Sequence, residues 1–287
     1  MIRNLVLCAA VVSAWFSPAS ARPSNDELKV MSFNIRIDTK ADGPNQWSNR
    51  RDFAANMIRF YDIDIFGAQE VFANQMTDLQ ERLPEYGSIG IGLEDGKSKG
   101  QHDPIFWKKE RFELLDHGFF WFAEDINAIG QRAWDAASPR MGSWAILKDK
   151  ISKRKLFFMN VHIDHIGQVA RRESAKLILD RLGALDGDLP VIVTGDFNAE
   201  PDSEPIRILL DPANPEHLTH TRSVAPIRYG PEWSYHNYGR LAKNMWLDYI
   251  FVRGGLETLR HGCLAEKLDD LYISDHCPVM AGLRFTK

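Results

Sequence analysis

Short apolar runs and amphipathic segments alternate along this chain. Runs rich in β-branched and aromatic residues predict buried strands at 28–35, 64–70 and 189–194. Apolar residues at helical spacing predict helices over 49–61 and 168–185. Because strands alternate with helices and no internal repeat interrupts them, the pattern indicates a layered α/β fold in which helices cover sheets.

The rest of the chain is richer in strands. Another helix is predicted over 72–83, where Pro84 ends it. The remaining strand-like runs are 104–107, 118–122, 143–147, 155–163, 246–252 and 277–285. The polar stretch 211–243, rich in Pro, His, Tyr and Trp, has no clear period. Long irregular segments of compact domains usually carry function or move, so we predict a substrate-side loop there.

The composition and length indicate the size of the core and the number of domains. The 287 residues are 44% hydrophobic and 26% charged, which is typical of a globular protein with a sizeable core. No composition shift or linker divides the chain. We therefore expect one domain over residues 22–287.

The first 21 residues have the character of a signal peptide. A basic start at Arg3 precedes an apolar run over 5–16 and small residues up to Ala21, so cleavage after Ala21 is expected. The alternative is a membrane anchor, but the run is shorter than the roughly 20 residues that span a bilayer. The mature chain, with no other run of transmembrane length, is then expected to be periplasmic or secreted. Whether its two cysteines, Cys263 and Cys277, form a disulfide stays open.

Net charge bears on the class of partner. The chain carries a formal charge of −4, and loss of Arg3 with the signal peptide would make it −5. Proteins that bind long polyanions usually present a basic face. Nucleic acid is therefore a possible partner that the charge does not favour. The charge favours small or membrane-dispersed substrates instead.

Polar residues of types that can take part in catalysis follow the predicted strands. Asp196 and Asn198 come directly after the strand 189–194, where the alternative is an Asx-type turn that caps a helix. His276 follows Asp275 just before the last strand and is suited to proton transfer near neutral pH. Asp248, an acid in an apolar strand, is the candidate carboxylate behind His276. The alternative for Asp248 is an edge strand facing solvent.

Oxygen ligands are present at two further strand ends, at Asn34 and Glu70. Hard divalent cations such as Mg²⁺ prefer carboxylate and amide oxygens. His162 and Asp164 end another strand on one face. A zinc site is the alternative, but no Cys or His spacing of zinc type is present.

Taken in order, these elements resemble the endonuclease/exonuclease/phosphatase superfamily, which contains DNase I-like nucleases, neutral sphingomyelinases and inositol polyphosphate phosphatases. The six matching motifs are Ser32-Phe33-Asn34-Ile35-Arg36, Gln69-Glu70, Asn160-Val161-His162, Gly195-Asp196-Phe197-Asn198, Leu247-Asp248-Tyr249-Ile250 and Ser274-Asp275-His276. Because they occur in the same order over nearly the whole mature chain, the resemblance is specific. It implies an α/β (α+β) four-layer sandwich, in which two mixed β-sheets pack face to face between helices, with the site at one edge.

The resemblance also implies a role for each motif residue in metal-dependent hydrolysis of a phosphate ester. Glu70 and Asn34, with Asp275, are expected to hold Mg²⁺ or Mn²⁺. Asp196 is expected to orient or deprotonate the attacking water. Three further residues complete the expected catalytic set: Asn198 and His162 as phosphate-holding donors, and His276, backed by Asp248, as the group that binds or protonates a phosphoryl oxygen.

The substrate is less defined. The segments 42–51 and 139–144 resemble an exported bacterial branch of the superfamily, and Arg50, Arg140 and Asn160 are candidate substrate contacts. One alternative is a secreted nuclease, which would need a basic groove with stacking platforms. The residues expected to form it are Arg222, Arg228, Arg240, Lys243, Trp233 and Tyr235. A non-catalytic binding module is the remaining alternative.

Overall fold

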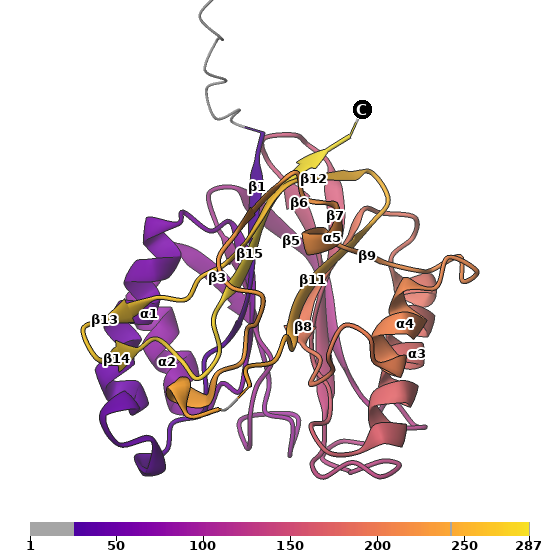
Figure 1. The fold of residues 1–287 in the computed structure, drawn as a ribbon. Helices are drawn as coiled ribbons and strands as arrows, with labels where there is room; N and C mark the ends of the chain where they lie inside the picture. Colours follow the sequence, from indigo (N-terminus) through magenta and orange to yellow (C-terminus); the bar gives the residue numbers. More distant parts are fainter. Residues whose placement is uncertain (1–25, 242, 287) are drawn as a thin grey trace, which may run out of the picture.

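A computed structural model describes residues 26–241 and 243–286, and two mixed β-sheets form its centre (Figure 1). The predicted signal peptide at residues 1–21 lies outside the described residues. The first sheet has the order β10-β12-β15-β1-β2-β4-β3 and the second β5-β6-β7-β8-β11-β9. The strands of the first sheet are β1 (Leu28–Asn34), β2 (Ile65–Gln69), β3 (Tyr86–Ile89), β4 (Ile105–Lys108), β10 (Ile227–Tyr229), β12 (Leu256–Cys263) and β15 (Val279–Phe285). Those of the second are β5 (Phe112–Trp121), β6 (Met141–Asp149), β7 (Lys155–His162), β8 (Val191–Asp196), β9 (Thr219–His220) and β11 (Asp248–Arg253).

Helices cover the outer face of each sheet. The pair α1 (Trp47–Phe60) and α2 (Ala73–Arg82) packs on the first sheet, and α3 (Gln168–Leu185) and α4 (Glu204–Leu210) pack on the second (Figure 1). The shorter elements are η1 (Lys40–Asn45), α5 (Thr221–Val224), η2 (Asn237–Gly239) and the small ribbon β13 (Lys267–Leu268) with β14 (Leu271–Tyr272). The predicted four-layer sandwich is confirmed.

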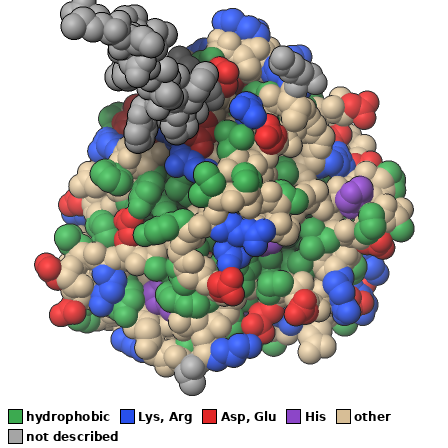
Figure 2. All heavy atoms as spheres, turned by 45° about the horizontal axis from the view of Figure 1, so that its top comes forward, with side chains coloured by type: hydrophobic (Ala, Val, Ile, Leu, Met, Phe, Trp, Pro, Cys, Tyr) green, Lys and Arg blue, Asp and Glu red, His purple; other side chains and the backbone are tan. Residues whose placement is uncertain are grey.

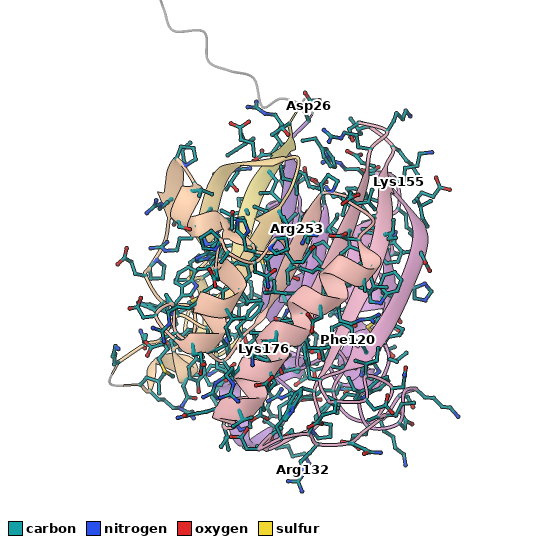
Figure 3. The ribbon with its side chains drawn as sticks, turned by 90° about the vertical axis from the view of Figure 1, so that its right-hand side faces the viewer. Asp26, Phe120, Arg132, Lys155, Lys176 and Arg253 are labelled. Atoms are coloured by element: carbon teal, nitrogen blue, oxygen red, sulfur yellow. The ribbon has the colours of Figure 1, made fainter. Side chains whose placement is uncertain are left out.

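Residue alternation along the strands explains the layers. In β1, Val30 contributes to the core between the sheets, whereas Met31 and Phe33 face the core under α1 and α2. In the second outer layer, Ile178 and Leu182 of α3 are buried against the sheet. Figure 3 shows α3 lying across this sheet, with Lys176 on the outer side. Burial of apolar area on both sides of each sheet drives this arrangement.

Most predicted elements match the structure, but β3 was not predicted, β5 begins at Phe112 rather than at 118, and the C-terminal third differs further. The helix predicted at 168–185 has those bounds, but β12 was missed. β12 lacks a continuous apolar run because polar residues such as Glu257 and Arg260 lie on its partly exposed positions. The stretch 211–243 is irregular as predicted, apart from the short elements β9, α5, β10 and η2.

The two sheets approach each other closely at Gly67 of β2. A Cβ atom there would lie 2.2 Å from Asn160 Oδ1 and 2.3 Å from Thr194 Oγ1, so only glycine permits this contact. Asn160 Oδ1 also accepts a hydrogen bond from Gln69 Nε2 at 2.6 Å, which joins β7 to β2. This contact fixes how the strand ends of the two sheets face each other.

The surface in Figure 2, seen from the end where β1 begins, carries basic and acidic side chains interspersed, with no block of one sign. Among residues 26–241 and 243–286, no helix is both long and apolar enough to cross a membrane.

Candidate active site

Strand register brings three chemically active residues together at one edge of the second sheet. His162 at the end of β7 is the parallel neighbour of Asp196 at the end of β8, and Asp248 at the start of β11 is the antiparallel neighbour of Asp196. β11 lies between β8 and β9, and Asp248 is 1% exposed, so the solvent-facing alternative for this acid is excluded. The first sheet supplies His276 from the segment before β15.

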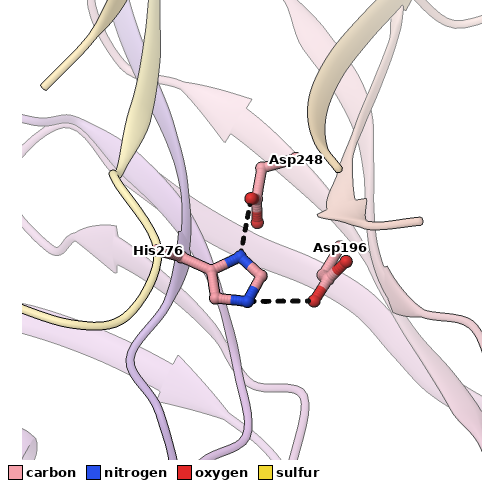
Figure 4. Close-up of side chains that lie close together, drawn as sticks. All are labelled: Asp196, Asp248 and His276. Carbon is pink, nitrogen blue, oxygen red and sulfur yellow. Dashed lines mark hydrogen bonds and ion pairs between the residues drawn. The ribbon is translucent and has the colours of Figure 1, made fainter. Parts of the chain in front are cut away.

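His276 lies between the two acids (Figure 4). Its Nδ1 is 2.8 Å from Asp248 Oδ2, and its Nε2 is 3.8 Å from Asp196 Oδ2. Burial by itself would lower the pKa of His276, but the negative charges of Asp248 and Asp196 and the hydrogen bond outweigh it and raise that pKa well above the usual value. His276 is therefore a buried imidazolium that can stabilise a developing negative charge.

Asp196 is held by two donors. Its Oδ2 accepts from Asn34 Nδ2 at 2.9 Å, and its Oδ1 accepts from the backbone N–H of Asn198 at 2.9 Å. Burial raises the pKa of Asp196 to about 7; the charge of Asp248 adds to this effect, while His276 and the hydrogen bonds oppose it. A carboxylate with a pKa near neutral is suited to accepting a proton from water.

Asn198 and His162 form the next part of the site. Asn198 has φ +45°, a left-handed conformation that asparagine tolerates better than most residues. Its Nδ2 donates to the carbonyl of Ile163 at 3.0 Å and lies 3.1 Å from His162 Nε2. Burial, and then the charge of Arg140, lower the pKa of His162 well below its usual value. His162 is therefore a neutral imidazole, unlike His276.

Glu70 and Asp275 form an acidic region beside these residues. Glu70, with φ +62°, accepts the N–H of Ile37 at 3.1 Å. Burial raises the pKa of Asp275, and the negative charge of Glu70 raises it further. The guanidinium of Arg36 lies 3.9 Å from Glu70 and 3.7 Å from Asp275. An oxygen-rich pair whose charges repel each other fits a hard divalent cation.

The amide of Asn34 is oriented as a donor in this structure. Its Nδ2 faces Glu70 at 3.3 Å as well as Asp196, and its Oδ1 accepts the N–H of Arg36 at 3.0 Å. To bind a cation through oxygen, the amide would have to turn over. A second arrangement also fits a metal ion, because ligand atoms of Asp196, Asp248 and His276 all lie within 4.8 Å of one another.

One pocket of about 570 Å³ contains most of these side chains. Its lining includes Arg36, Glu70, His162, Asp196, Asn198, Leu247, Asp275 and His276 from the motifs, and Ile37, Phe72, Leu93, Glu94, Gln101, Ser138, Pro139, Arg140, His165, Tyr235 and Met245 around them. Asn34 and Asp248 lie behind this surface and hold Asp196 and His276. The motif residues predicted for catalysis and metal binding therefore converge.

Arg140 is placed at the pocket as predicted. It is 7% exposed, its Nη2 is 3.0 Å from His165 Nδ1, and its Nε is 3.6 Å from Asp164. Asp164 also accepts backbone N–H groups from Ala137 and Ser138. Asp164 thereby fixes the loop that presents Arg140.

The predicted substrate contact at Arg50 is wrong. Arg50 is fully buried, and its guanidinium donates to the carbonyls of Asn45 and Ile35, both at 2.6 Å, and of Ile273 at 2.8 Å. It therefore joins the end of β1 to the segment that carries Asp275. Its role is to hold the site together from behind.

The predicted substrate contact at Asn160 is also wrong. Its side chain is fully buried between the sheets, where its Nδ2 donates to the carbonyls of Ala68 at 2.8 Å and Pro104 at 3.1 Å. These bonds and those to Gln69 and Thr194 use its hydrogen-bonding capacity.

Among the lining residues that were not predicted for the hydrolase site, Arg36 and Tyr235 lie beside the catalytic groups. Arg36 is in the first matched motif and has φ +61°, a conformation that only the structure reveals. Tyr235 lies in the irregular stretch 211–243, and its ring centroid is 4.7 Å from that of His276. Part of this stretch therefore lines the pocket, and its role as a substrate-side loop stays a prediction. No sequence period marked either residue.

Comparison with known proteins agrees with this geometry. Residues 31–276 match the model of the Endonuclease/Exonuclease/phosphatase family. The structure is similar to that of an endonuclease/exonuclease/phosphatase from Bacteroides vulgatus, with 35% identity and a TM-score of 0.87, covering 90% of this chain and 99% of the other. It is also similar to a mannosyl-6-phosphatase of Bacteroides thetaiotaomicron, with 32% identity and a TM-score of 0.84, covering 90% and 100%. An uncharacterized protein of Acanthamoeba polyphaga mimivirus is 25% identical over 270 residues, which are 88% of this chain and 98% of the viral protein.

Proposed function

Because the chain belongs to the endonuclease/exonuclease/phosphatase family, whose members hydrolyse phosphate esters, we propose that it is an exported phosphoester hydrolase that depends on a divalent metal. The observation that carries the proposal is the convergence of Asp196, His276 and Glu70 on one pocket. Asp196 ends β8 of the second sheet, whereas Glu70 follows β2 and His276 precedes β15 of the first sheet, so both sheets contribute to the pocket.

Asp196 and His276 divide the proton and charge chemistry between them. With a pKa of about 7, Asp196 accepts a proton from water as the water attacks phosphorus in line with the leaving oxygen. His276, kept positive by Asp248, faces the negative charge that develops on the phosphoryl oxygens. Asn198 and Arg140 line the same pocket and supply further N–H groups to the phosphate.

Glu70 and Asp275, with the turned amide of Asn34, are the residues that would hold Mg²⁺ or Mn²⁺. Such an ion supplies Lewis-acid neutralisation of phosphate charge. Within the chain, Arg36 is the basic side chain beside these two acids.

A phosphomonoester or small phosphodiester is the substrate class that the pocket supports best. Its volume of about 570 Å³ falls within the range of roughly 300–1,000 Å³ found for small-molecule sites. The similarity to a mannosyl-6-phosphatase supports the monoester.

A nuclease is the second candidate, since the family includes nucleases by name. Its predicted basic groove finds little support, because Arg222 pairs with Glu232 and Lys243 with Glu200. Arg228 donates to backbone carbonyls, and none of these three residues lines the described pocket.

Export rests on the sequence of residues 1–21, with their basic start, apolar run and small residues before the expected cleavage. Mass spectrometry of the protein recovered from the periplasm or medium should find Arg22 at its N-terminus.

The chemistry is tested with the purified protein on p-nitrophenyl phosphate and bis-p-nitrophenyl phosphate. We expect hydrolysis of at least one ester in Mg²⁺ or Mn²⁺ and its loss in chelator. Asp196→Ala should reduce the rate by a hundredfold or more, the typical order for loss of a central catalytic group. Asp202→Ala, which removes an exposed acid close in sequence, is the control and should retain the rate. Full activity in Asp196→Ala, or in chelator, would contradict the mechanism.

A further inference from the structure

The catalytic pocket is also lined by residues that the hydrolysis of phosphate does not require. They are Leu93, Glu94 and Gln101 from the segment 90–103, and Tyr235 and Met245 from another part of the chain. All five residues line the same cavity as the catalytic groups. If phosphate lies beside those groups, these five residues are the ones left to contact the alcohol portion of a small ester.

The segment that carries Glu94 is a well-ordered loop. The N–H of Leu93 donates to the carbonyl of Gln101 at 2.9 Å, and the N–H of Glu94 donates to that of Lys99 at 3.1 Å. Trp121 Nε1 then donates to the carbonyl of Leu93 at 2.8 Å, which ties the loop to β5. Gly130, with φ +70°, packs so closely that a Cβ there would lie 2.3 Å from the carbonyl oxygen of Glu94. Glu94 is therefore presented from a backbone held on several sides.

The carboxylate of Glu94 is available to a ligand. Glu94 is exposed, and among the residues that the structure describes no Lys, Arg or His lies within ion-pair distance of it. A carboxylate only accepts hydrogen bonds, so it attracts hydroxyl groups and repels anions. Gln101 and Ser138, which can both donate and accept, line the same pocket.

The acids among the catalytic groups have cationic neighbours, whereas Glu94 has none within the described part of the chain. Arg36 lies 3.9 Å from Glu70 and 3.7 Å from Asp275, and His276 lies 3.8 Å from Asp196. A nucleic-acid strand or a polyphosphate would bring a further negative charge beside the carboxylate of Glu94. An uncharged polyol would instead meet hydrogen-bonding partners. Repulsion of the wrong ligand is a common source of specificity.

We propose that Glu94 is a specificity residue that selects phosphate esters of uncharged, hydroxyl-bearing alcohols and rejects esters with a second negative charge in the alcohol portion. This proposal rests on the proposed function, because it assumes that phosphate is hydrolysed at Asp196 and His276. It names the chemical class of the alcohol, which the family alone leaves open.

A pair of substrates that differ in one charge tests the proposal. Glucose 6-phosphate and 6-phosphogluconate are similar in size and hydroxylation, but the second carries a carboxylate. We expect the wild-type enzyme to prefer glucose 6-phosphate in kcat/KM, and Glu94→Gln to reduce that preference about tenfold, the order expected for two like charges several ångströms apart in a partly solvated site. Because the preference is a ratio measured in one preparation, partial unfolding of the variant cancels.

Glu124→Gln, which neutralises an exposed acid outside the pocket, is the matched control and should keep the wild-type ratio. An unchanged ratio in Glu94→Gln would overturn the proposal, and so would a wild-type preference for 6-phosphogluconate. Phosphocholine is a third substrate in the test. If the wild-type enzyme hydrolysed it faster than glucose 6-phosphate, and Glu94→Gln lost that preference, Glu94 would instead select a cationic alcohol and the proposal would be overturned. Failure of the proposed function gives a different result, namely no metal-dependent hydrolysis of either p-nitrophenyl phosphate or bis-p-nitrophenyl phosphate.

Discussion

His276 and His261 are buried to nearly the same degree, 4% and 1% exposed, but their neighbours differ in kind. His276 contacts two carboxylates, from Asp248 and Asp196. His261 on β12 contacts the hydroxyl of Thr221 at 2.9 Å, and its ring packs 5.8 Å from the rings of both Trp246 and His220. The first environment is acidic and the second aromatic.

The two environments give opposite charge states. The acids keep His276 protonated, whereas burial lowers the pKa of His261 and of His220 to about 3. The positive charges of Arg222 and Arg228 lower both of these pKa values further. Burial of a histidine therefore does not by itself indicate a catalytic role. A carboxylate partner, at a position where the histidine also lines a pocket, is the better indication of such a role.

The largest expected effect comes from removing the charge that keeps His276 protonated. Asp248→Asn keeps the shape of the side chain, but it withdraws the carboxylate from Nδ1. We expect kcat/KM for the best p-nitrophenyl ester to fall about a hundredfold or more, because both the orientation and the positive charge of His276 are lost. Steady-state kinetics with matched circular dichroism spectra measures this. If activity remained within threefold of wild type, the two histidine environments would not differ in function as we infer.

The two histidine environments should change the free energy of unfolding in opposite directions as the pH falls. His220 and His261 have folded-state pKa values depressed below 6.5, so the stability they contribute is present above pH 6.5 and is lost as the pH falls toward about 3. The raised pKa of His276 acts oppositely, since its contribution is present below pH 6.5 and is lost as the pH rises through the folded-state value. From pH 6.5 to 5, the free energy of unfolding should therefore fall by about 3 kcal/mol, roughly half from each of His220 and His261, because each takes up a proton when the chain unfolds.

Urea unfolding at pH 6.5 and pH 5 measures that loss. His261→Phe, which keeps an aromatic ring beside Trp246 but cannot be protonated, should lose less stability between the two pH values than wild type. An equal loss in the variant would place the acid sensitivity elsewhere in the molecule.

The sequence was sufficient to locate the site residues that end strands. Asp196, His162 and Asp248 are adjacent because strand register places them at one edge, and their motifs mark where those strands end or begin. Asn160 lies on the same face of β7 as His162, since side chains alternate with a period of two. It is one step deeper, opposite Thr194, and so it is enclosed between the sheets.

Other features depended on contacts between distant segments. An arginine on a helix usually faces solvent, and Arg50 is buried because backbone carbonyls, including those of the distant Ile35 and Ile273, accept from its guanidinium. Tyr235 reaches His276 through a bridge between segments 41 residues apart. The layered fold was predictable from periodicity and motif order, while β12 was not, because its apolar residues are too few to stand out.

The smallest expected effect tests the hydrogen bond that orients His261. Thr221 Oγ1 donates to the carbonyl of Ile250 at 2.8 Å, so it can only accept from His261 Nδ1. Thr221→Val preserves the shape of the side chain and leaves that N–H without its acceptor. We expect the free energy of unfolding to fall by about 2 kcal/mol, because the variant removes both of these buried hydrogen bonds and each usually contributes about 1 kcal/mol. Since Thr221 does not line the pocket, kcat/KM should stay within twofold of wild type, in contrast with Asp248→Asn. A loss of activity comparable to that of Asp248→Asn would contradict this expectation. It would show that the hydrogen bond from His261 to Thr221 matters for catalysis as much as the one from His276 to Asp248.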